Sequence, residues 1–208
     1  MHHIDGVVAR TGSLNTVYFV EGKKYATSTD GEGFYQNLIS SVKGFSVEGN
    51  RAIVLGAGGS AKAVIERLLR AGISNIAVMN RSLERVDELK AAFGNQITPL
   101  SPDHFANESK NAALLINTTA LGMKGQPLLE IDLSALPSTA VVADLVYVPL
   151  ETDLLKAAKA RGLRTVGGLG MLLHQAVPGF ELWFGHRPEV TQELYDHVAA
   201  DIIADRHK

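Results

Sequence analysis

The sequence predicts an α/β fold in which helices cover both faces of a doubly wound parallel sheet. Short, wholly apolar segments such as AIVL and ALLI alternate with amphipathic segments of helical periodicity. Strands of that kind are buried on both faces, as in parallel sheets with crossover helices. Hydrophobic residues make up 46% of the 208 residues, which is enough for a buried core. We expect the doubly wound part over residues ~50 to ~167.

The elements follow one another in a regular order. TVYFV and KKYAT flank Glu21-Gly22 and predict a β-hairpin, and FYQNLISSV then has helical spacing. Strands and helices alternate afterwards: strand RAIVLGA, helix SAKAVIERLLRAG, strand NIAVMN, helix SLERVDELKAAFG, strands ALLINTT and VVADLVY, helix ETDLLKAAKARG and a short strand at RTVGG. Two helices, GMLLHQAVPGFELWFG and TQELYDHVAADIIADRH, close the chain.

Composition argues against several classes of protein. A net charge of −2 favours neither nucleic acid nor an anionic membrane as partner. The absence of cysteine excludes disulfides and thiolate chemistry and fits a reducing compartment. The seven histidines show no ligand spacing, so no metal is expected. The apolar runs are too short to span a bilayer and no signal peptide is recognised, so we expect a cytoplasmic protein.

A glycine-rich turn follows the first strand of the alternating region. Gly56, Gly58 and Ala61 have the G-x-G-x-x-G/A spacing between a strand and a helix. Gly56 permits the tight turn, Gly58 lets the backbone approach a pyrophosphate, and Ala61 lets helix and strand pack closely. The positive end of the helix then faces the phosphates. The pattern predicts dinucleotide binding on a Rossmann-type sheet.

The end of the next strand indicates which dinucleotide binds. NAD proteins usually place an acidic residue there, whereas this chain has Asn80-Arg81-Ser82, with Arg85 one turn further. A guanidinium can hold a 2′-phosphate through two charge-assisted hydrogen bonds, so NADP is favoured. In an alternative interpretation, Asn80 and Ser82 cap the helix and the arginines are solvated; both can hold together.

Seven motifs in one order resemble the shikimate dehydrogenase family: GSLNT, STDGEGF, GAGGSAKA, NRSLER, INTTALGM, DLVYVPLETDLL and GLGMLLHQA. The resemblance implies NADP(H)-dependent interconversion of 3-dehydroshikimate and shikimate, in aromatic amino-acid biosynthesis. It implies a remnant of an N-terminal α/β substrate domain at 1–45, an NADP-binding domain at 46–185, and a helix at 186–208 that returns to the substrate domain.

The resemblance also assigns residues. Asn15, Tyr147 and Gln175 match positions that contact substrate, and Asp30 matches the acidic residue that pairs with a catalytic lysine and contacts substrate. The residues matching cofactor positions are Gly56, Ala57, Gly58, Gly59, Ser60, Ala61, Asn80, Arg81, Ser82, Arg85, Thr118, Leu145, Gly168 and Met171.

Taken one at a time, these residues also allow a purely structural interpretation. Asp30 before Gly31 and Asn15 in GSLN are typical of turns, Gln175 of a helix surface and Tyr147 of a core. The order of all seven motifs favours the functional reading for Asp30, Asn15 and Gln175, and less firmly for Tyr147.

The family carries an N-V-T-x-P-x-K segment with its catalytic lysine before GSLNT, and this sequence contains none. We therefore expect the chain to begin inside the substrate domain, to bind NADP(H), and to turn over shikimate poorly. The hairpin would then leave open strand edges, predicting self-association or disorder of residues ~1 to ~30. Two alternatives remain open: a non-catalytic NADP-binding module, and a dehydrogenase for quinate.

Overall fold

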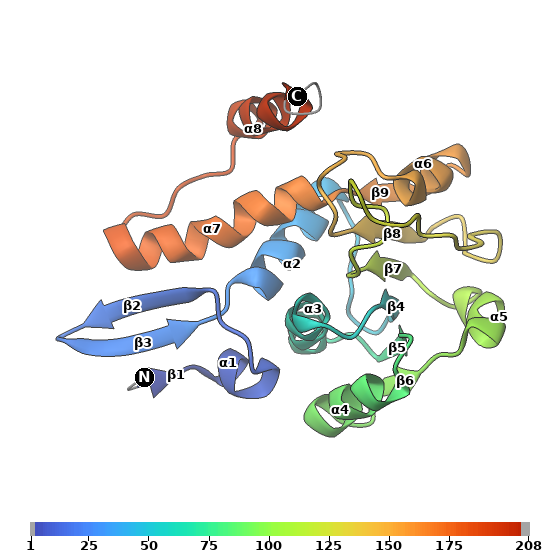
Figure 1. Ribbon diagram of the computed structural model, residues 1–208, viewed down its shortest axis with the longest axis horizontal. Coiled ribbons are helices and arrows are strands. Elements are labelled where there is room, and N and C mark those ends of the chain that lie inside the picture. The colour runs from blue at the N-terminus through green and yellow to red at the C-terminus, as the bar shows by residue number, and fades with distance from the viewer. Residues whose placement is uncertain (1–2, 205–208) are drawn as a thin grey trace.

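Six parallel strands form the main sheet of the computed structural model, which describes residues 3–204 (Figure 1). They are β4 (Arg51–Leu55), β5 (Asn75–Met79), β6 (Ile97–Pro99), β7 (Leu114–Asn117), β8 (Val141–Asp144) and β9 (Arg164–Val166). Their order in space is β6-β5-β4-β7-β8-β9, so the chain winds outward from β4 in one direction and then returns to β7 on its other side. This is a doubly wound sheet with its switch point between β4 and β7, and the predicted fold class is confirmed.

Side chains of the main sheet divide between two cores. Ala52 and Val54 of β4 belong to one cluster, whereas Ile53 and Leu55 belong to the other. Alternation of this kind follows from the two-residue period of a strand. The first cluster includes residues of α2 (Asp30–Ser41), α3 (Gly59–Arg70) and α4 (Leu83–Phe93), and the second includes residues of α5 (Phe105–Ser109) and α6 (Asp153–Ala160). Helices therefore cover both faces, as the wholly apolar strands predict.

A second, small sheet is formed by the N-terminal residues. It consists of β1 (His3–Ile4), β3 (Lys23–Thr27) and β2 (Thr16–Val20), in that order, with the helix α1 (Gly6–Thr11) between β1 and β2. β2 and β3 are antiparallel and are joined by Glu21 (φ 48°) and Gly22 (φ 74°), so the predicted hairpin is confirmed. From residue 3 to residue 30 the expected disorder is not found, and residues 1–2 lie outside the described range.

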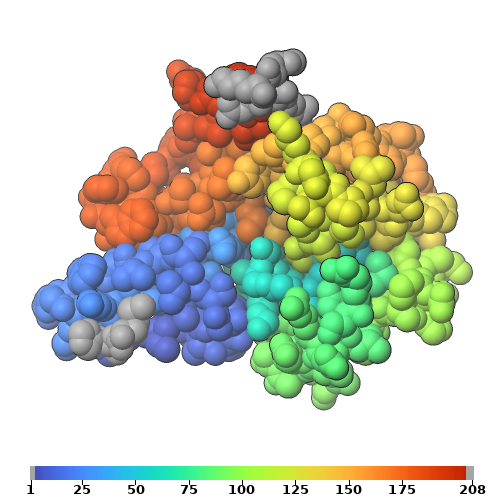
Figure 2. All heavy atoms as spheres, viewed as in Figure 1, coloured from blue at the N-terminus to red at the C-terminus, as the bar shows by residue number. Residues whose placement is uncertain are grey.

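Two long helices, α2 and α7 (Gly168–Phe184), lie between the small sheet and the main one. α7 starts after β9 and packs on α2, and the Trp183 indole near its end donates a 2.9 Å hydrogen bond to the Val17 carbonyl of β2. The helices pack closely: a Cβ on Gly33 of α2 would lie 2.5 Å from Cβ of Gln175. α8 (Gln192–Ala204) buries no residue, lies apart from the rest of the chain in Figure 1 and touches α7 only lightly. In the space-filling view the cyan start of α3 lies between the blue N-terminal part and the green and yellow segments (Figure 2).

The prediction missed several short elements and misplaced some boundaries: β8 ends at Asp144 rather than Tyr147, and α7 begins at Gly168 rather than Gly170. β1, α1, β6, α5 and the 3₁₀ turn Pro102–His104 are too short for a clear periodic signal. α2 begins at Asp30 rather than Phe34, because Gly31 and Gly33 hide its first turn from a propensity-based reading. Within residues 3–204, no helix is long and apolar enough to cross a membrane.

Candidate functional site

Three residues far apart in the sequence meet at one polar cluster. The side-chain amide of Asn15 donates to the Asp30 carboxylate (Nδ2 to Oδ1, 2.8 Å) and to the Gln175 carbonyl (Nδ2 to Oε1, 3.2 Å). Asn15 precedes β2, Asp30 begins α2 and Gln175 lies on α7. The structure thus brings together the three residues for which the joint motif order favoured a role with substrate.

Asn15 is held by more than this pair of contacts. Its Oδ1 accepts from the backbone N–H of Thr29 (3.0 Å) and from the Thr16 hydroxyl (2.9 Å), and Thr29 Oγ1 lies 2.9 Å from Asn15 Nδ2. The backbone N–H of Asn15 also donates to the Thr27 carbonyl at 3.2 Å. Its side chain is therefore fixed in one orientation. Thr29 was missed in the sequence, although it directly precedes Asp30.

Asp30 is the first residue of α2, where the helix dipole favours a negative charge. The pKa of Asp30 is raised above its usual range because the carboxyl group is partly buried. The hydrogen bond from Asn15 acts in the opposite direction but is the smaller effect. Within residues 3–204 the Asp30 carboxylate forms no ion pair. It can therefore still accept hydrogen bonds from a cation or a hydroxyl.

The glycine-rich turn leaves no room for a side chain at Gly56 and open space at Gly58. Gly56 has φ 104°, and a Cβ there would lie 2.8 Å from Thr118 Oγ1 and 3.0 Å from Thr119 Cγ2. A Cβ on Gly58 would meet no protein atom within 4 Å. Gly58 is the N-cap of α3 and provides no side chain to satisfy the first N–H groups of the helix. These N–H groups and the open space above Gly58 fit the phosphates of a dinucleotide.

The two arginines after β5 are exposed, and neither forms an ion pair with another described residue. Asn80 Nδ2 donates to the Ser82 carbonyl at 2.9 Å, which shapes the turn between them. Ser82 is the N-cap residue of α4, but its side chain makes no capping hydrogen bond. Arg81 and Arg85 are thus available for an anion, and the capping alternative holds for the position of Ser82 only.

A buried polar network lies where β7 and β8 end. Asp144 is 2% exposed and accepts from Asn117 Nδ2 (2.9 Å), the Val146 N–H (3.0 Å) and the Thr152 hydroxyl (2.7 Å). Burial raises the pKa of Asp144 and outweighs these hydrogen bonds, which lower it. Asn117 Oδ1 in turn accepts from Thr119 N–H at 3.0 Å. Sequence reasoning missed Asn117 and Asp144, although a polar residue ending an apolar strand is the available signal.

The network holds the loops that carry the remaining predicted cofactor residues. Thr118 Oγ1 donates to the Leu55 carbonyl at 2.7 Å, and Leu145 N–H donates to the Asn117 carbonyl at 3.0 Å. A Cβ on Gly168 would lie 2.2 Å from the Leu145 carbonyl oxygen, so glycine is required there. Met171 packs against the first core cluster.

Tyr147 lies in the loop after β8 and is 39% exposed, so it is not a core residue. Among the described residues it makes no hydrogen bond with Asn15, Asp30 or Gln175. A cavity of about 480 Å³ lies elsewhere, between α2, β9, α7 and α8, and none of the predicted site residues lines it. Within residues 3–204 there is no group of three or more His, Asp or Glu side chains arranged for a metal ion.

Comparisons with known proteins match this architecture. A family profile described as "Shikimate / quinate 5-dehydrogenase" matches residues 38–132, and one described as "Shikimate 5'-dehydrogenase C-terminal domain" matches residues 168–192. A shikimate dehydrogenase (NADP(+)) of Rhodopseudomonas palustris strain TIE-1 is 56% identical over 191 residues, which cover 92% of this chain and 68% of the relative.

Two solved structures show the same fold. The shikimate 5-dehydrogenase of Thermus thermophilus in complex with NADP(H) and shikimate has a TM-score of 0.82 at 32% identity, covering 97% of this chain and 73% of that one. A quinate dehydrogenase from Corynebacterium glutamicum in complex with NAD has a TM-score of 0.85 at 28% identity, covering 96% of this chain and 72% of that one.

Proposed function

The chain belongs to the shikimate dehydrogenase family, and on that premise we propose that it interconverts shikimate and 3-dehydroshikimate with NADP(H). The observation that carries the proposal is the convergence of Asn15, Asp30 and Gln175 beside a dinucleotide-binding turn. We call the glycine-rich turn at residues 56–61 the phosphate loop. A Cβ on Gly59, the first residue of α3, would lie 3.8 Å from Ser13 Oγ, so the GSLNT segment passes close to this loop. Substrate hydroxyls and cofactor would then meet at one place.

The residues proposed for NADP(H) follow the ends of five strands of the main sheet, β4, β5, β7, β8 and β9. Gly56 to Ala61 receive the pyrophosphate through backbone N–H groups, and Arg81 and Arg85 hold the 2′-phosphate. The nicotinamide would be bordered by Thr118, Leu145, Gly168 and Met171. Asn80 and Ser82 shape the turn that carries Arg81. When bound, the nicotinamide supplies or accepts the hydride.

The polar cluster orients the substrate. Asn15 and Gln175 offer amide donors and acceptors, the groups that neutral hydroxyls require. Asp30 holds Asn15 in place and has acceptor capacity for a hydroxyl or a cationic acid–base group. Tyr147 is proposed to contact the substrate from the loop after β8.

The N-V-T-x-P-x-K segment, in which the resembled family carries its catalytic lysine, is not among these 208 residues. We propose that a polypeptide of this sequence binds NADP(H) but reacts slowly, since loss of an acid–base group costs about two to four orders of magnitude in rate. A non-catalytic NADP-binding module explains the same absence. The retained cluster of Asn15, Asp30 and Gln175 favours the enzyme.

The test measures NADP reduction at 340 nm with shikimate and, separately, with quinate, alongside shikimate affinity by calorimetry of the NADP-loaded protein. We expect specific binding of shikimate and slow turnover. Turnover at ordinary enzyme rates would contradict the slow reaction, and NADP binding without any affinity for shikimate would favour the module. A preference for quinate would identify the alternative substrate, which the quinate dehydrogenase relative makes worth testing.

We propose further that the protein self-associates through β2. Phe19 is 65% exposed and Val20 is 47% exposed, and β2 pairs only with β3 in the described part of the chain. Apart from the Val17 carbonyl, which accepts a hydrogen bond from Trp183, the outer edge of this apolar strand is open, and such an edge favours pairing with a second copy. Sedimentation should show a dimer that Phe19→Lys dissociates into monomers, and a monomeric wild type would contradict this.

The net charge of −2 and the lack of cysteine support a cytoplasmic protein with small-molecule partners. We also propose the division of the chain into domains at 1–45, 46–185 and 186–208.

A further inference from the structure

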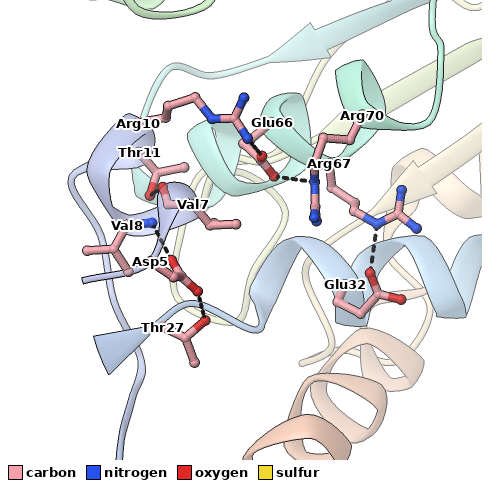
Figure 3. A network of polar contacts seen from close by, with 10 residues as sticks. All are labelled: Asp5, Val7, Val8, Arg10, Thr11, Thr27, Glu32, Glu66, Arg67 and Arg70. Carbon is pink, nitrogen blue, oxygen red and sulfur yellow. Dashed lines mark hydrogen bonds and ion pairs between the residues drawn. The ribbon is translucent and has the colours of Figure 1, made fainter. Parts of the chain in front are cut away.

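Glu66 lies inside α3, and its carboxylate-bearing side chain is 2% exposed. Both of its oxygens meet a guanidinium: Oε1 accepts from Arg10 Nη2 of α1, and Oε2 lies 3.2 Å from Arg70 Nε on α3 itself (Figure 3). A buried carboxylate needs such charged partners to compensate its lost hydration. Since Arg70 belongs to the same helix as Glu66, only the Arg10 contact joins two separate elements.

α1, which carries Arg10, is attached at its other end to the small sheet. Asp5 caps α1 by accepting a 2.9 Å hydrogen bond from the Val8 N–H, and its second oxygen accepts from the Thr27 hydroxyl at the end of β3 (Figure 3). α1 has only six residues, a length at which a helix is not stable on its own. Its position on α3 therefore depends on the buried Val8 and Thr11 and on the ion pair of Arg10.

The loop that follows α1 reaches the start of α3. Ser13 lies near Gly59, at the phosphate loop, whereas Arg10 binds Glu66. Glu66 is about two turns further along α3 than Gly59, which is roughly 10 Å. The segment from Arg10 to Ser13 thus contacts α3 at two separated points. Both contacts are made by the part of the chain that directly precedes Asn15.

The next residue of α3 makes the corresponding contact with α2. Arg67 Nε lies 2.7 Å from Glu32 Oε2, and its guanidinium stacks 3.6 Å from the centre of the Tyr35 ring. α2 begins with Asp30. Glu66 and Arg67, which are neighbours on α3, therefore make ion pairs with α1 and α2, respectively (Figure 3).

We propose that Glu66 is a positioning residue, whose ion pair with Arg10 clamps α1 on α3 and sets the distance between Asn15 and the cofactor's phosphate loop. Without the clamp, the Ser13–Asn15 segment moves relative to α3, and the substrate binds more weakly at an unfavourable distance. NADP(H) binding is unaffected, because none of its proposed residues lies on α1. The effect on substrate rests on the proposed function, whereas the mechanical clamp does not.

The test compares Arg10→Met with Arg70→Met. Each removes one guanidinium from Glu66, and the two arginine side chains are similarly exposed, at 51% and 46%. Only Arg10→Met removes the ion pair between α1 and α3. In the NADPH-loaded protein we expect amide hydrogen exchange of residues 6–15 to accelerate about tenfold in Arg10→Met and to stay unchanged in Arg70→Met. Shikimate affinity should fall about tenfold in Arg10→Met alone, with NADPH affinity unchanged, and Arg10→Lys should recover part of it.

Two outcomes would overturn the clamp. Equal acceleration in both variants would show that Glu66 only requires charge compensation, and no acceleration in either would show that the other contacts of α1 hold it without Arg10. A wild-type protein without affinity for shikimate would refute the proposed function instead, while the exchange rates would still decide the clamp. If both variants had equally lowered melting temperatures, this general loss of stability would not explain faster amide exchange in Arg10→Met alone.

Discussion

Asn117 Nδ2 donates a 2.9 Å hydrogen bond to Asp144 Oδ1, joining the carboxyl ends of the central strands β7 and β8 inside the protein. Replacing Asp144 by alanine leaves Asn117 Nδ2 and the Val146 N–H without this acceptor in a buried place. Each buried donor left unsatisfied costs about 1–3 kcal/mol. We expect Asp144→Ala to lower the free energy of unfolding by more than about 2 kcal/mol in urea denaturation.

Asp153→Ala serves as the matched control for this loss. Asp153 and its partner Lys156 are 57% and 56% exposed, so their ion pair contributes less than about 1 kcal/mol. A similar loss of stability in both variants would contradict a special role for the buried network.

Ionisation of Asp144 should make stability depend on pH. Burial raises its folded-state pKa above the ordinary value of 3.8, so its contribution is fully present below that value and is lost as pH rises through the folded pKa. Asp144→Asn cannot ionise. We expect the free energy of unfolding of the wild type, relative to Asp144→Asn, to fall as pH rises toward neutrality. A difference that is constant or increases with pH would refute this.

Gly58→Ala should weaken cofactor binding without harming the fold. Its new Cβ would meet no protein atom within 4 Å, but would occupy the space proposed for the pyrophosphate. We expect NADPH affinity to fall at least about tenfold, while unfolding free energy changes by less than about 1 kcal/mol. Gly6→Ala, which also meets no protein atom within 4 Å, is the control and should leave affinity unchanged.

Gly33→Ala tests the contact between α2 and α7. The added methyl would lie 2.5 Å from Cβ of Gln175 and 2.6 Å from its backbone nitrogen, so the helices must separate. Overpacking of this kind costs about 1–3 kcal/mol, and it displaces Gln175 from Asn15. Calorimetry should show weaker shikimate binding together with a lower melting temperature. Unchanged values for both would show that the helices adjust freely.

The choice of dinucleotide is tested by the double variant Arg81→Ala/Arg85→Ala. Hydrogen bonds to charged groups contribute about 1.5–3 kcal/mol, so affinity for NADPH should fall at least about tenfold. Affinity for NADH should remain the same, because it has no 2′-phosphate. Fluorescence titration measures both, and Lys156→Ala, an exposed cation away from these loops, is the control. An equal loss for both dinucleotides would indicate damage to the loop rather than lost selectivity.

Local sequence patterns were sufficient for most of the fold. Each strand of the main sheet except β6 was predicted, because a run of apolar residues such as those of β4 is itself the signal of a doubly buried strand. The turn at Gly56 and Gly58 was recognisable because its conformation depends on those residues and their neighbours. α1 and α5 gave no such signal, since each has fewer than seven residues.

By itself the sequence determined the alternation of strands and helices, the phosphate loop and, through its motifs, the family. Only the tertiary structure decided that Asn15, Asp30 and Gln175 touch, that Glu66 is buried between two arginines, and that Asp144 joins two strand ends. Conformation within an element follows from residues that are neighbours in the chain. Contacts across 15 to 160 residues depend on how α2 and α7 pack, which no local pattern encodes.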